Sequence, residues 1–161
     1  MLTIVYRSEA VDRLPYSALA DICLFSARKN RELGVTGFLV EFEGIFLQVL
    51  EGEPDVVEQL LGSIVIDPRH RNVEVLVRET TVGLPNFGFW AMNFGPLDTP
   101  TFWQAVFGAP IKVEEFRRRS HDADFALDVL ARAYMHACIA AEVDAATREL
   151  VRGNIPCFEA V

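Results

Sequence analysis

The segment Ile45–Leu50, with the sequence IFLQVL, constrains the fold of this chain more than any other stretch. Successive side chains of a strand alternate between its two faces. One face would carry Phe46, Gln48 and Leu50, and the other would carry Ile45, Leu47 and Val49. Large apolar groups thus occur on both faces, and such a strand must be covered on both sides. The segment predicts a sheet with a packed layer on each face.

The side-chain amide of Gln48 is the one polar group inside this segment. A buried amide left without hydrogen-bond partners costs on the order of 1–3 kcal/mol. Its partners must therefore come from a neighbouring element or from a bound ligand. Both interpretations stay open on the strength of Gln48 alone.

Hydrophobic periodicity and the positions of glycine and proline predict the other elements. In chain order they are a strand over residues 2–8, a helix over 15–33 that stops at Gly34, strands over 35–42 and 45–51 joined at Glu43-Gly44, a helix from Pro54 to the Asp67-Pro68 break, a strand over 73–78 and a strand over 89–94. This β-α-β-β-α-β order plus one strand predicts an α+β fold with a ferredoxin-like layout. Right-handed crossovers place both helices on one face of a five-stranded mixed sheet.

The second face of the sheet needs a cover, which the residues from Pro96 onward can supply. A short helix is expected over Phe102–Val106 and a longer one over about Ala123–Val143. The apolar set of the longer helix is Phe125, Val129, Leu130, Ala133, Tyr134 and Ala137. We therefore expect two parts, a domain over residues 1–95 and a C-terminal helical extension over residues 96–161.

Composition limits the classes of partner. The 161 residues are 51% hydrophobic, which is ample for a core, yet no apolar run reaches the roughly 18 residues of a membrane span. The formal charge of −8 argues against nucleic acid, which normally requires a basic patch. Arg117–Arg119 is the local exception and is interpreted as a solvated helix face.

The three cysteines, Cys23, Cys138 and Cys157, are odd in number and lack CxxC spacing, which predicts neither a disulfide framework nor a zinc site. The chain starts in a strand-like segment without the pattern of a signal peptide. A reducing cytoplasm is therefore the expected location, and no metal site is expected.

Polar residues converge if the central strands adjoin. Alternation places Tyr6 on the face of Ile4, and Gln48 on the face of Phe46. If both are the helix-facing sides of adjacent strands, a phenol and an amide meet beneath the helices. Asn30 ends the apolar stripe of the first helix near the same point.

Such a pocket suits a planar heteroaromatic ligand. Its faces would pack on Ile22 and Ile64, and its edge would meet Lys29, Asn30 and Gln48. Taken singly, Tyr6 and Asn30 have ordinary structural interpretations, as a core tyrosine and a residue at a helix end.

Five segments in this order resemble the BLUF family, the blue-light sensors that use flavin, across roughly residues 1–95. They are Ile4-Val5-Tyr6-Arg7-Ser8, Asn30 with Gly34-Val35-Thr36-Gly37, Gly44-Ile45-Phe46-Leu47-Gln48-Val49-Leu50-Glu51-Gly52, Asp67-Pro68-Arg69-His70 with Val73, and Phe89-Trp90-Ala91-Met92. The resemblance implies a noncovalently bound FAD, or FMN or riboflavin in some settings, between the two helices.

The resemblance also implies residue roles. Tyr6 would be the photochemical electron and proton donor, with Gln48 between it and the flavin edge. The remaining implied contacts are Asn30 and Lys29 at the pyrimidine part of the ring and Ile22, Phe46 and Ile64 flanking the ring, and Trp90 and Met92 would be the switching residues of strand five. Arg69 and His70 are interpreted as the loop at the exit of the second helix and are counted with the cofactor-binding residues, with His70 as the one that would touch the flavin tail.

Beyond Pro96 the sequence holds no GGDEF, EAL or cyclase-like motif. We therefore expect a non-enzymatic photoreceptor that signals to a protein partner and forms a homo-oligomer. The alternative is a ferredoxin-like module without photochemistry that oligomerises through its sheet. A flavin redox enzyme ranks last, because Tyr6 and Gln48 would occupy the flavin edge that a substrate needs.

Overall fold

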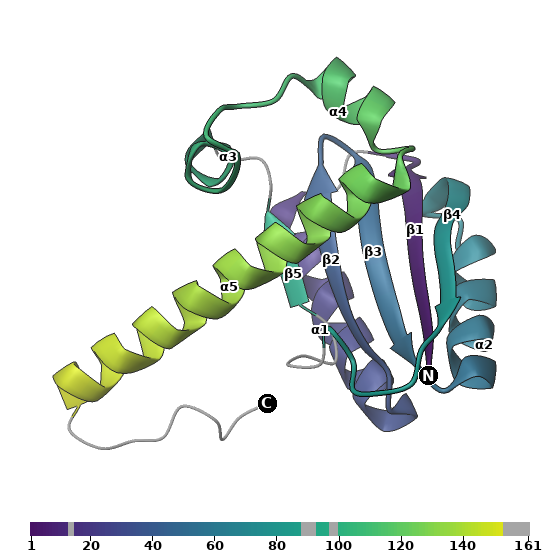
Figure 1. The fold of residues 1–161 in the computed structure, drawn as a ribbon, viewed down its shortest axis with the longest axis horizontal. Coiled ribbons are helices and arrows are strands. Elements are labelled where there is room, and N and C mark those ends of the chain that lie inside the picture. The colour runs from purple at the N-terminus through teal and green to yellow at the C-terminus, as the bar shows by residue number, and fades with distance from the viewer. Residues whose placement is uncertain (13–14, 88–92, 97–99, 153–161) are drawn as a thin grey trace.

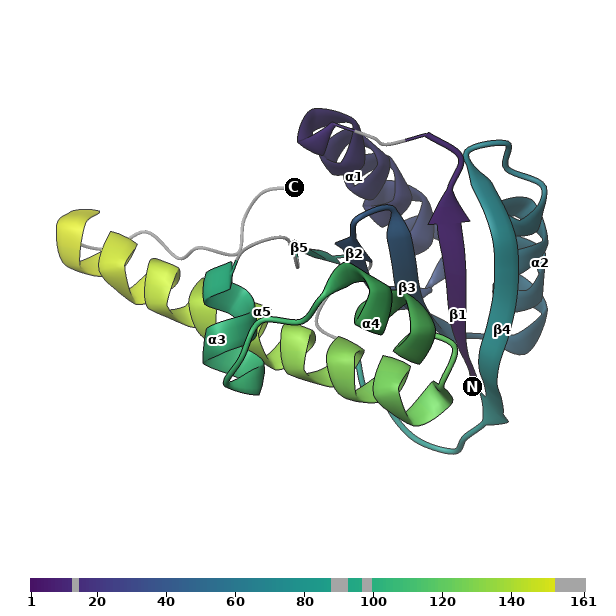
Figure 2. The same cartoon turned by 90° about the horizontal axis from the view of Figure 1, so that it is seen from above.

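A computed structural model of the chain describes residues 1–12, 15–87, 93–96 and 100–152. Its elements are β1 (Leu2–Ala10), α1 (Tyr16–Leu33), β2 (Thr36–Phe42), β3 (Ile45–Gly52), α2 (Pro54–Val65), β4 (His70–Thr80), β5 (Asn93–Pro96), α3 (Pro100–Phe107), α4 (Val113–Arg119) and α5 (Ala123–Arg152). Figures 1 and 2 show the sheet as a central layer, with α1 and α2 on one face and the C-terminal helices on the other.

The sheet has the strand order β4-β1-β3-β2-β5, which puts β1 and β3 at its centre. The first four strands pair antiparallel, and β5 pairs parallel to β2, so the sheet is mixed. The predicted α+β fold with a ferredoxin-like layout is confirmed. Most of the range predicted for the fifth strand, residues 89–94, lies outside the described residues.

Local backbone chemistry sets two of the element boundaries. Helix α1 ends at Gly34, whose φ of 67° lets its N–H reach the carbonyls at the helix end. The β2–β3 hairpin turns through Glu43 and Gly44, both at positive φ, as a tight hairpin turn of type I′ requires. The Gly44 N–H also donates to the Glu41 carboxylate at 2.6 Å. Both boundaries match the sequence prediction.

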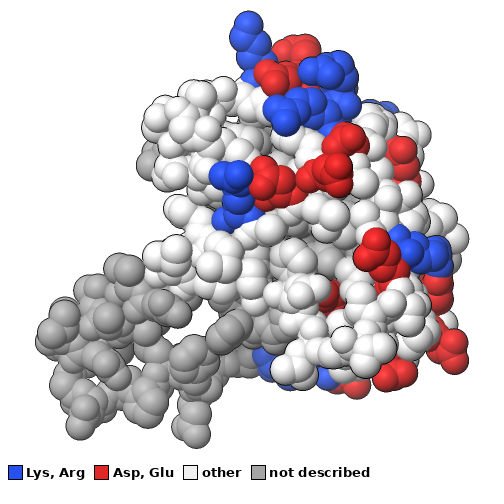
Figure 3. Space-filling model, in the orientation of Figure 1, with Lys and Arg blue, Asp and Glu red and all other residues white. Residues whose placement is uncertain are grey.

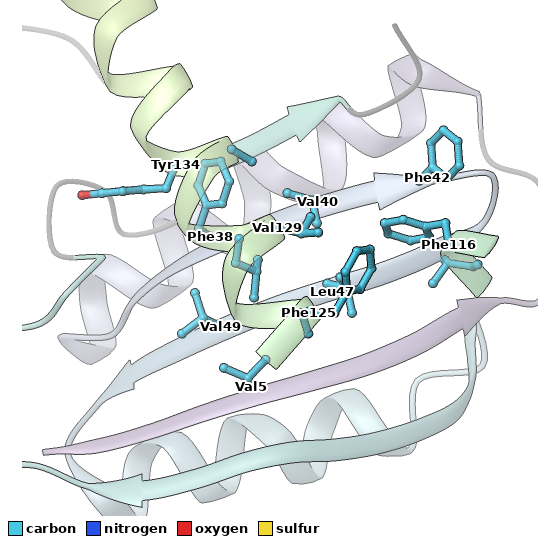
Figure 4. Close-up of a cluster of buried hydrophobic side chains, with 14 of the residues drawn as sticks. Val5, Phe38, Val40, Phe42, Leu47, Val49, Phe116, Phe125, Val129 and Tyr134 are labelled. Carbon is cyan, nitrogen blue, oxygen red and sulfur yellow. The ribbon is translucent and has the colours of Figure 1, made fainter. Parts of the chain in front are cut away.

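Two separate hydrophobic cores fill the spaces above and below the sheet. The core under α1 and α2 includes Ile4, Tyr6, Phe46 and Leu50. The opposite core joins Val5, Ile45, Leu47 and Val49 to side chains of the C-terminal helices, some of which Figure 4 shows in close-up. The expected cover on both faces of β3 is therefore confirmed.

Helix α5 supplies most of the cover on the second face. Its predicted apolar set packs in the core, and Figure 1 shows the helix running across the sheet and then past it. The helix continues to Arg152, beyond the predicted end at Val143, because residues 144–152 are rich in good helix formers although their apolar periodicity is weak. Within the described ranges no helix combines the length and hydropathy that a bilayer crossing requires.

Helix α4 was not predicted as an element of its own. It is seven residues long and buries a single large side chain, Phe116, so its sequence carries no helical periodicity to detect. The predicted solvated face is confirmed, because Arg117, Arg118 and Arg119 are all exposed on it.

Two charged side chains are buried on the α5 side of the central strands. Arg7 on β1 is 1% exposed, and Glu51 on β3 is fully buried. The Glu51 carboxylate accepts hydrogen bonds from the backbone N–H groups of Asn86 at 3.1 Å and Phe87 at 2.8 Å. It thereby fixes the connection between β4 and β5 to the end of β3.

Candidate functional site

A cavity of about 150 Å³ lies between the sheet and helices α1 and α2. Strands β1 and β3 form its floor with Tyr6, Phe46 and Gln48. The helices form its walls with mostly apolar side chains, and the α2–β4 connection closes one end. The wall and end residues are Leu19, Ile22, Cys23, Phe25, Ser26, Lys29, Asn30, Leu60, Ser63, Ile64, Asp67, Arg69 and His70, and Leu39 of β2 completes the lining.

Every cofactor-binding residue named from the sequence lines this one cavity. They are Tyr6, Ile22, Lys29, Asn30, Phe46, Gln48, Ile64, Arg69 and His70. The two switching residues, Trp90 and Met92, lie outside the described residues. These nine residues come from five elements, β1, α1, β3, α2 and β4, and from the α2–β4 connection, and they lie up to 64 positions apart in the chain, from Tyr6 to His70.

Tyr6 and Gln48 form the centre of the cavity floor. They are register partners in the antiparallel β1–β3 pair, and the Tyr6 hydroxyl donates a hydrogen bond to Gln48 Oε1. Burial, reinforced by the negative charge of Asp67, raises the pKa of the Tyr6 phenol well above its usual value. The phenol therefore keeps its proton at neutral pH and is available as a hydrogen-bond donor to the amide.

Asn30 is placed by the end of helix α1. Its carbonyl accepts the N–H of Val35 at 2.8 Å, which anchors the last helical turn to the start of β2. The residue is 1% exposed, whereas Lys29 beside it is exposed. The last turn of α1 thus presents a buried amide and a solvated cation to the same end of the cavity.

His70 forms a second polar pair next to Tyr6 and Gln48. Its Nδ1 lies 2.9 Å from the hydroxyl of Ser8, and its ring packs on Phe46 with centroids 5.4 Å apart. Burial lowers the pKa of His70, which favours the neutral imidazole. Sequence reasoning did not single out Ser8, although Ser8 shares the parity of Tyr6 on β1 and could have been found by it.

Asp67 is the second polar residue that was not predicted as part of the site, although it was used as a helix stop and belongs to the fourth of the family segments. Its carboxylate accepts a bond from the Arg69 guanidinium at 2.5 Å and from the Arg69 backbone N–H at 2.9 Å. These bonds to Arg69 lower the pKa of Asp67 to about 2. The pair fixes the α2–β4 connection where it borders the cavity.

We expect Asp67→Asn to destabilise the protein at neutral pH by weakening the bonds to Arg69. Because the folded-state pKa of Asp67 is lowered from 3.8 to about 2, its contribution is complete above pH 4 and disappears as pH falls from 4 towards 2. Urea unfolding from pH 7 to pH 2.5 should show the gap between wild type and variant closing in that window. A gap that stays constant with pH would contradict this account.

The donor set fits a flat aromatic heterocycle with a polar edge. Apolar side chains of α1 and α2 can cover its faces, whereas the floor and the Asn30 end offer amide and hydroxyl groups. Burial raises the pKa of the Cys23 thiol to about 11, so this cysteine is an inert wall residue. Among the described residues no group of three or more His, Cys, Asp or Glu side chains could hold a metal ion.

Comparison with known sequences identifies relatives over the N-terminal part of the chain. The family model for BLUF, sensors of blue-light using FAD, matches residues 1–93. The beta subunit of a photoactivated adenylate cyclase from Euglena longa is 35% identical over 88 residues, which are 55% of this chain and 10% of the relative. The blue light- and temperature-regulated antirepressor BluF of Escherichia coli is 32% identical over 77 residues, 48% of this chain and 19% of the relative. The curated relatives are therefore much longer than the part they share with this chain.

Solved structures give the same result for the fold. A bacterial light-regulated adenylyl cyclase superposes with a TM-score of 0.64 at 28% identity, covering 75% of this chain and 35% of that one. BlrB, a BLUF protein in its dark state, superposes with a TM-score of 0.66 at 21% identity, covering 85% of this chain and 96% of its own. The second likeness extends past residue 93 and supports the fold alone.

The family match spans more than half of the chain and includes β1, α1, β2, β3, α2 and β4, which are the elements that build the cavity. The family resemblance drawn from the sequence motifs is thereby confirmed. This chain belongs to the BLUF family, the sensors of blue light that use FAD.

Proposed function

We propose that this chain is a blue-light photoreceptor that binds FAD in the cavity between α1, α2 and the sheet, with FMN or riboflavin as substitutes. The observation that carries the proposal is the direct hydrogen bond from the Tyr6 hydroxyl to Gln48 Oε1 on the cavity floor. A buried phenol and a buried amide facing one cavity form a donor and a switchable partner for a photoexcited cofactor.

The cavity residues divide the binding task by chemistry. Ile22, Phe46 and Ile64 would cover the faces of the flavin ring, and the Asn30 amide would bond its pyrimidine edge, with Lys29 close by. Arg69 and His70 line the α2–β4 end, where they would border the ribityl and phosphate tail. Phe25, which lines the cavity yet is 69% exposed, marks where it opens to the surface.

Flavin that has absorbed blue light supplies a strong oxidant beside Tyr6. Tyr6 gives up an electron and its phenolic proton, and the proton moves along the bond to the Gln48 amide. Gln48 then rotates or tautomerises before the electron and proton return to Tyr6, so no group is oxidised overall. A buried network with two hydrogen-bonded arrangements can hold the new state and bias a distant interface.

The output is protein contact rather than catalysis. We assign residues 1–95 to the photosensor and residues 96–161 to the output and oligomerisation extension. The light-induced change in hydrogen bonding would pass to strand five at Trp90 and Met92, and from there to the helices after Pro96. We propose that a separate protein partner in the cytoplasm receives the signal, since the chain holds no cyclase-like motif beyond Pro96.

Reconstitution of the purified protein with FAD tests the proposal. The expected result is a yellow protein whose flavin absorption shifts to the red under blue light and recovers in the dark. A protein that stays colourless after reconstitution would refute flavin binding and favour the ferredoxin-like binding module. A yellow protein whose spectrum does not respond to blue light would refute the photoreceptor role alone.

We expect Asn30→Ala to weaken flavin binding by about 5- to 150-fold, because loss of a buried polar contact costs on the order of 1–3 kcal/mol. Titration of the protein into free flavin, followed by flavin fluorescence, measures the affinity. Glu32→Ala is the matched control, since Glu32 is exposed on the same turn of α1 and does not line the cavity. Equal affinities for both variants would remove Asn30 from the binding set.

A further inference from the structure

Strand β1 directs two adjacent polar side chains, Tyr6 and Arg7, to opposite faces of the sheet. Tyr6 lies on the cavity floor, and Arg7, the next residue, points into the layer between the sheet and the C-terminal helices. Arg7 is 1% exposed, and its Nε donates to the Ser120 hydroxyl at 2.8 Å. A single peptide unit therefore separates the proposed photochemical donor from a contact with the C-terminal helices.

Ser120 lies at the turn between α4 and α5 and is fully buried. Its backbone N–H donates to the Phe116 carbonyl at 2.8 Å, and its hydroxyl donates to the Arg117 carbonyl at 2.9 Å. The hydroxyl thus accepts from Arg7 and donates to the last turn of α4 at the same time. Helix α5 begins only three residues later, at Ala123.

Glu9 compensates the charge of Arg7 and links it to neighbouring elements. Its carboxylate lies 2.8 Å from Arg7, 3.5 Å from Arg117 on α4 and 3.6 Å from Arg71 on β4. Arg71 directly follows His70, which lines the cavity. Figure 3 shows basic and acidic side chains lying next to one another on the surface over α4. The buried guanidinium is therefore part of a network that touches β1, β4 and α4.

The pairing of β1 with β4 is irregular on both sides of this point. The register shifts between Val5 and Tyr6 and again between Arg7 and Glu9, whereas the pairing of β1 with β3 is continuous. Register irregularities of this kind locally interrupt a ladder and re-aim side chains, and they are frequent near functional sites. Tyr6 and Arg7 are therefore paired less regularly with β4 than the rest of β1 is.

A purely structural role explains the burial of Arg7 less well than a functional one. Its neighbours on this face of β1 and β3, Val5 and Leu47, are apolar, whereas its polar contacts are with Ser120 and Glu9. Replacing a buried ion pair by packed apolar groups is often neutral or stabilising. The N–H groups of a guanidinium have a rigid planar geometry, so the hydrogen bond from Arg7 to Ser120 sets the orientation of the α4–α5 turn in addition to packing against it. We therefore interpret the role of Arg7 as orienting the α4–α5 turn rather than as adding to the free energy of unfolding.

We propose that Arg7 is a positioning residue that transmits the state of the Tyr6–Gln48 pair through Ser120 to the turn between α4 and α5. The proposal rests on the photoreceptor function above and adds a route that leaves the cavity through β1. When the Tyr6–Gln48 bond rearranges, the adjoining peptide of β1 adjusts, and the Arg7–Ser120 bond lengthens or breaks. The start of α5 then changes its contact with the sheet.

Hydrogen–deuterium exchange in the dark and under blue light tests the proposal on the full chain reconstituted with FAD. Wild type should show a light-dependent change in exchange in peptides covering residues 113–130. Ser120→Ala and Arg7→Lys should each retain the flavin red shift yet lose at least half of that change, and the double variant should lose no more than either alone. Ser17→Ala, an exposed position on α1, is the control and should match wild type.

The outcomes separate this inference from the function on which it rests. A wild type that shows the red shift but no exchange difference at residues 113–130 would overturn the inference alone. So would a Ser120→Ala variant with the full wild-type difference, or single variants whose effects add in the double variant. A wild type without any red shift would overturn the photoreceptor function and this inference with it.

Discussion

Tyr6→Phe should bind flavin as wild type does and lose the light-induced red shift completely. The substitution removes one hydroxyl from the cavity floor and leaves the ring in place, so the buried packing of β1 is kept. It also removes the donor to Gln48 Oε1 and the proton that the proposed reaction moves. Difference absorption before and after a blue-light pulse measures the effect on protein reconstituted with FAD.

Tyr134→Phe is the matched control for this experiment. Tyr134 is also a buried tyrosine, but it lies on α5 against Phe38 and Phe87, on the opposite side of the sheet from the cavity. Its loss of a hydroxyl should leave the red shift intact. A Tyr6→Phe variant that still shows a full red shift would refute the role assigned to Tyr6, whatever the control does.

Phe116→Ala should lower the free energy of unfolding by about 3–5 kcal/mol, the range for removing a fully buried aromatic side chain. Phe116 is the single buried side chain of α4. Its ring meets Phe42 of β2 with centroids 5.0 Å apart, and it also contacts Trp103 and Phe125 edge-on. Removing it leaves a cavity where α3, α4, α5 and the sheet meet. Urea unfolding at fixed flavin loading measures the change.

Met135→Ala serves as the control for Phe116→Ala. Met135 belongs to α5 but is 56% exposed, so its truncation should change the free energy of unfolding by no more than about 0.5 kcal/mol. A loss at Phe116 as small as that at Met135 would mean that α4 contributes little to the attachment of the C-terminal helices.

The architecture of the first 80 residues was predictable because each element carries its own signal. Apolar residues on both faces of β3 predicted two covering layers. Gly34 predicted the C-terminal end of α1 and Pro54 predicted the start of α2, as the structure has them. Strand β4 begins at His70, earlier than the predicted residue 73, since its first residues are polar and pair with β1 without apolar alternation. Tertiary pairing, which no local pattern records, set that boundary.

The gathering of the candidate site was predictable from strand parity and helix spacing, which are enough to bring Tyr6, Gln48 and Asn30 to one cavity. Their roles toward flavin follow from the family resemblance and remain predictions. The burial of Arg7 was not predicted, because it depends on Ser120, which lies 113 positions away in the chain. A contact between residues so far apart in the chain cannot be predicted from the sequence around either residue.

The carboxylate of Glu51 has a consequence for how the chain can vary. The connection from β4 to β5 passes from one edge of the sheet to the other, beyond β1, β3 and β2. The Glu51 carboxylate holds this connection at Asn86 and Phe87 through hydrogen bonds from their backbone N–H groups. Just before them, Val82 and Leu84 are fully or almost fully exposed. Thr81 is held by backbone hydrogen bonds to Met1, and Asn86 and Phe87 are held by Glu51, so residues 82–84 are the part of this connection where we expect exchange or insertion of residues to be tolerated.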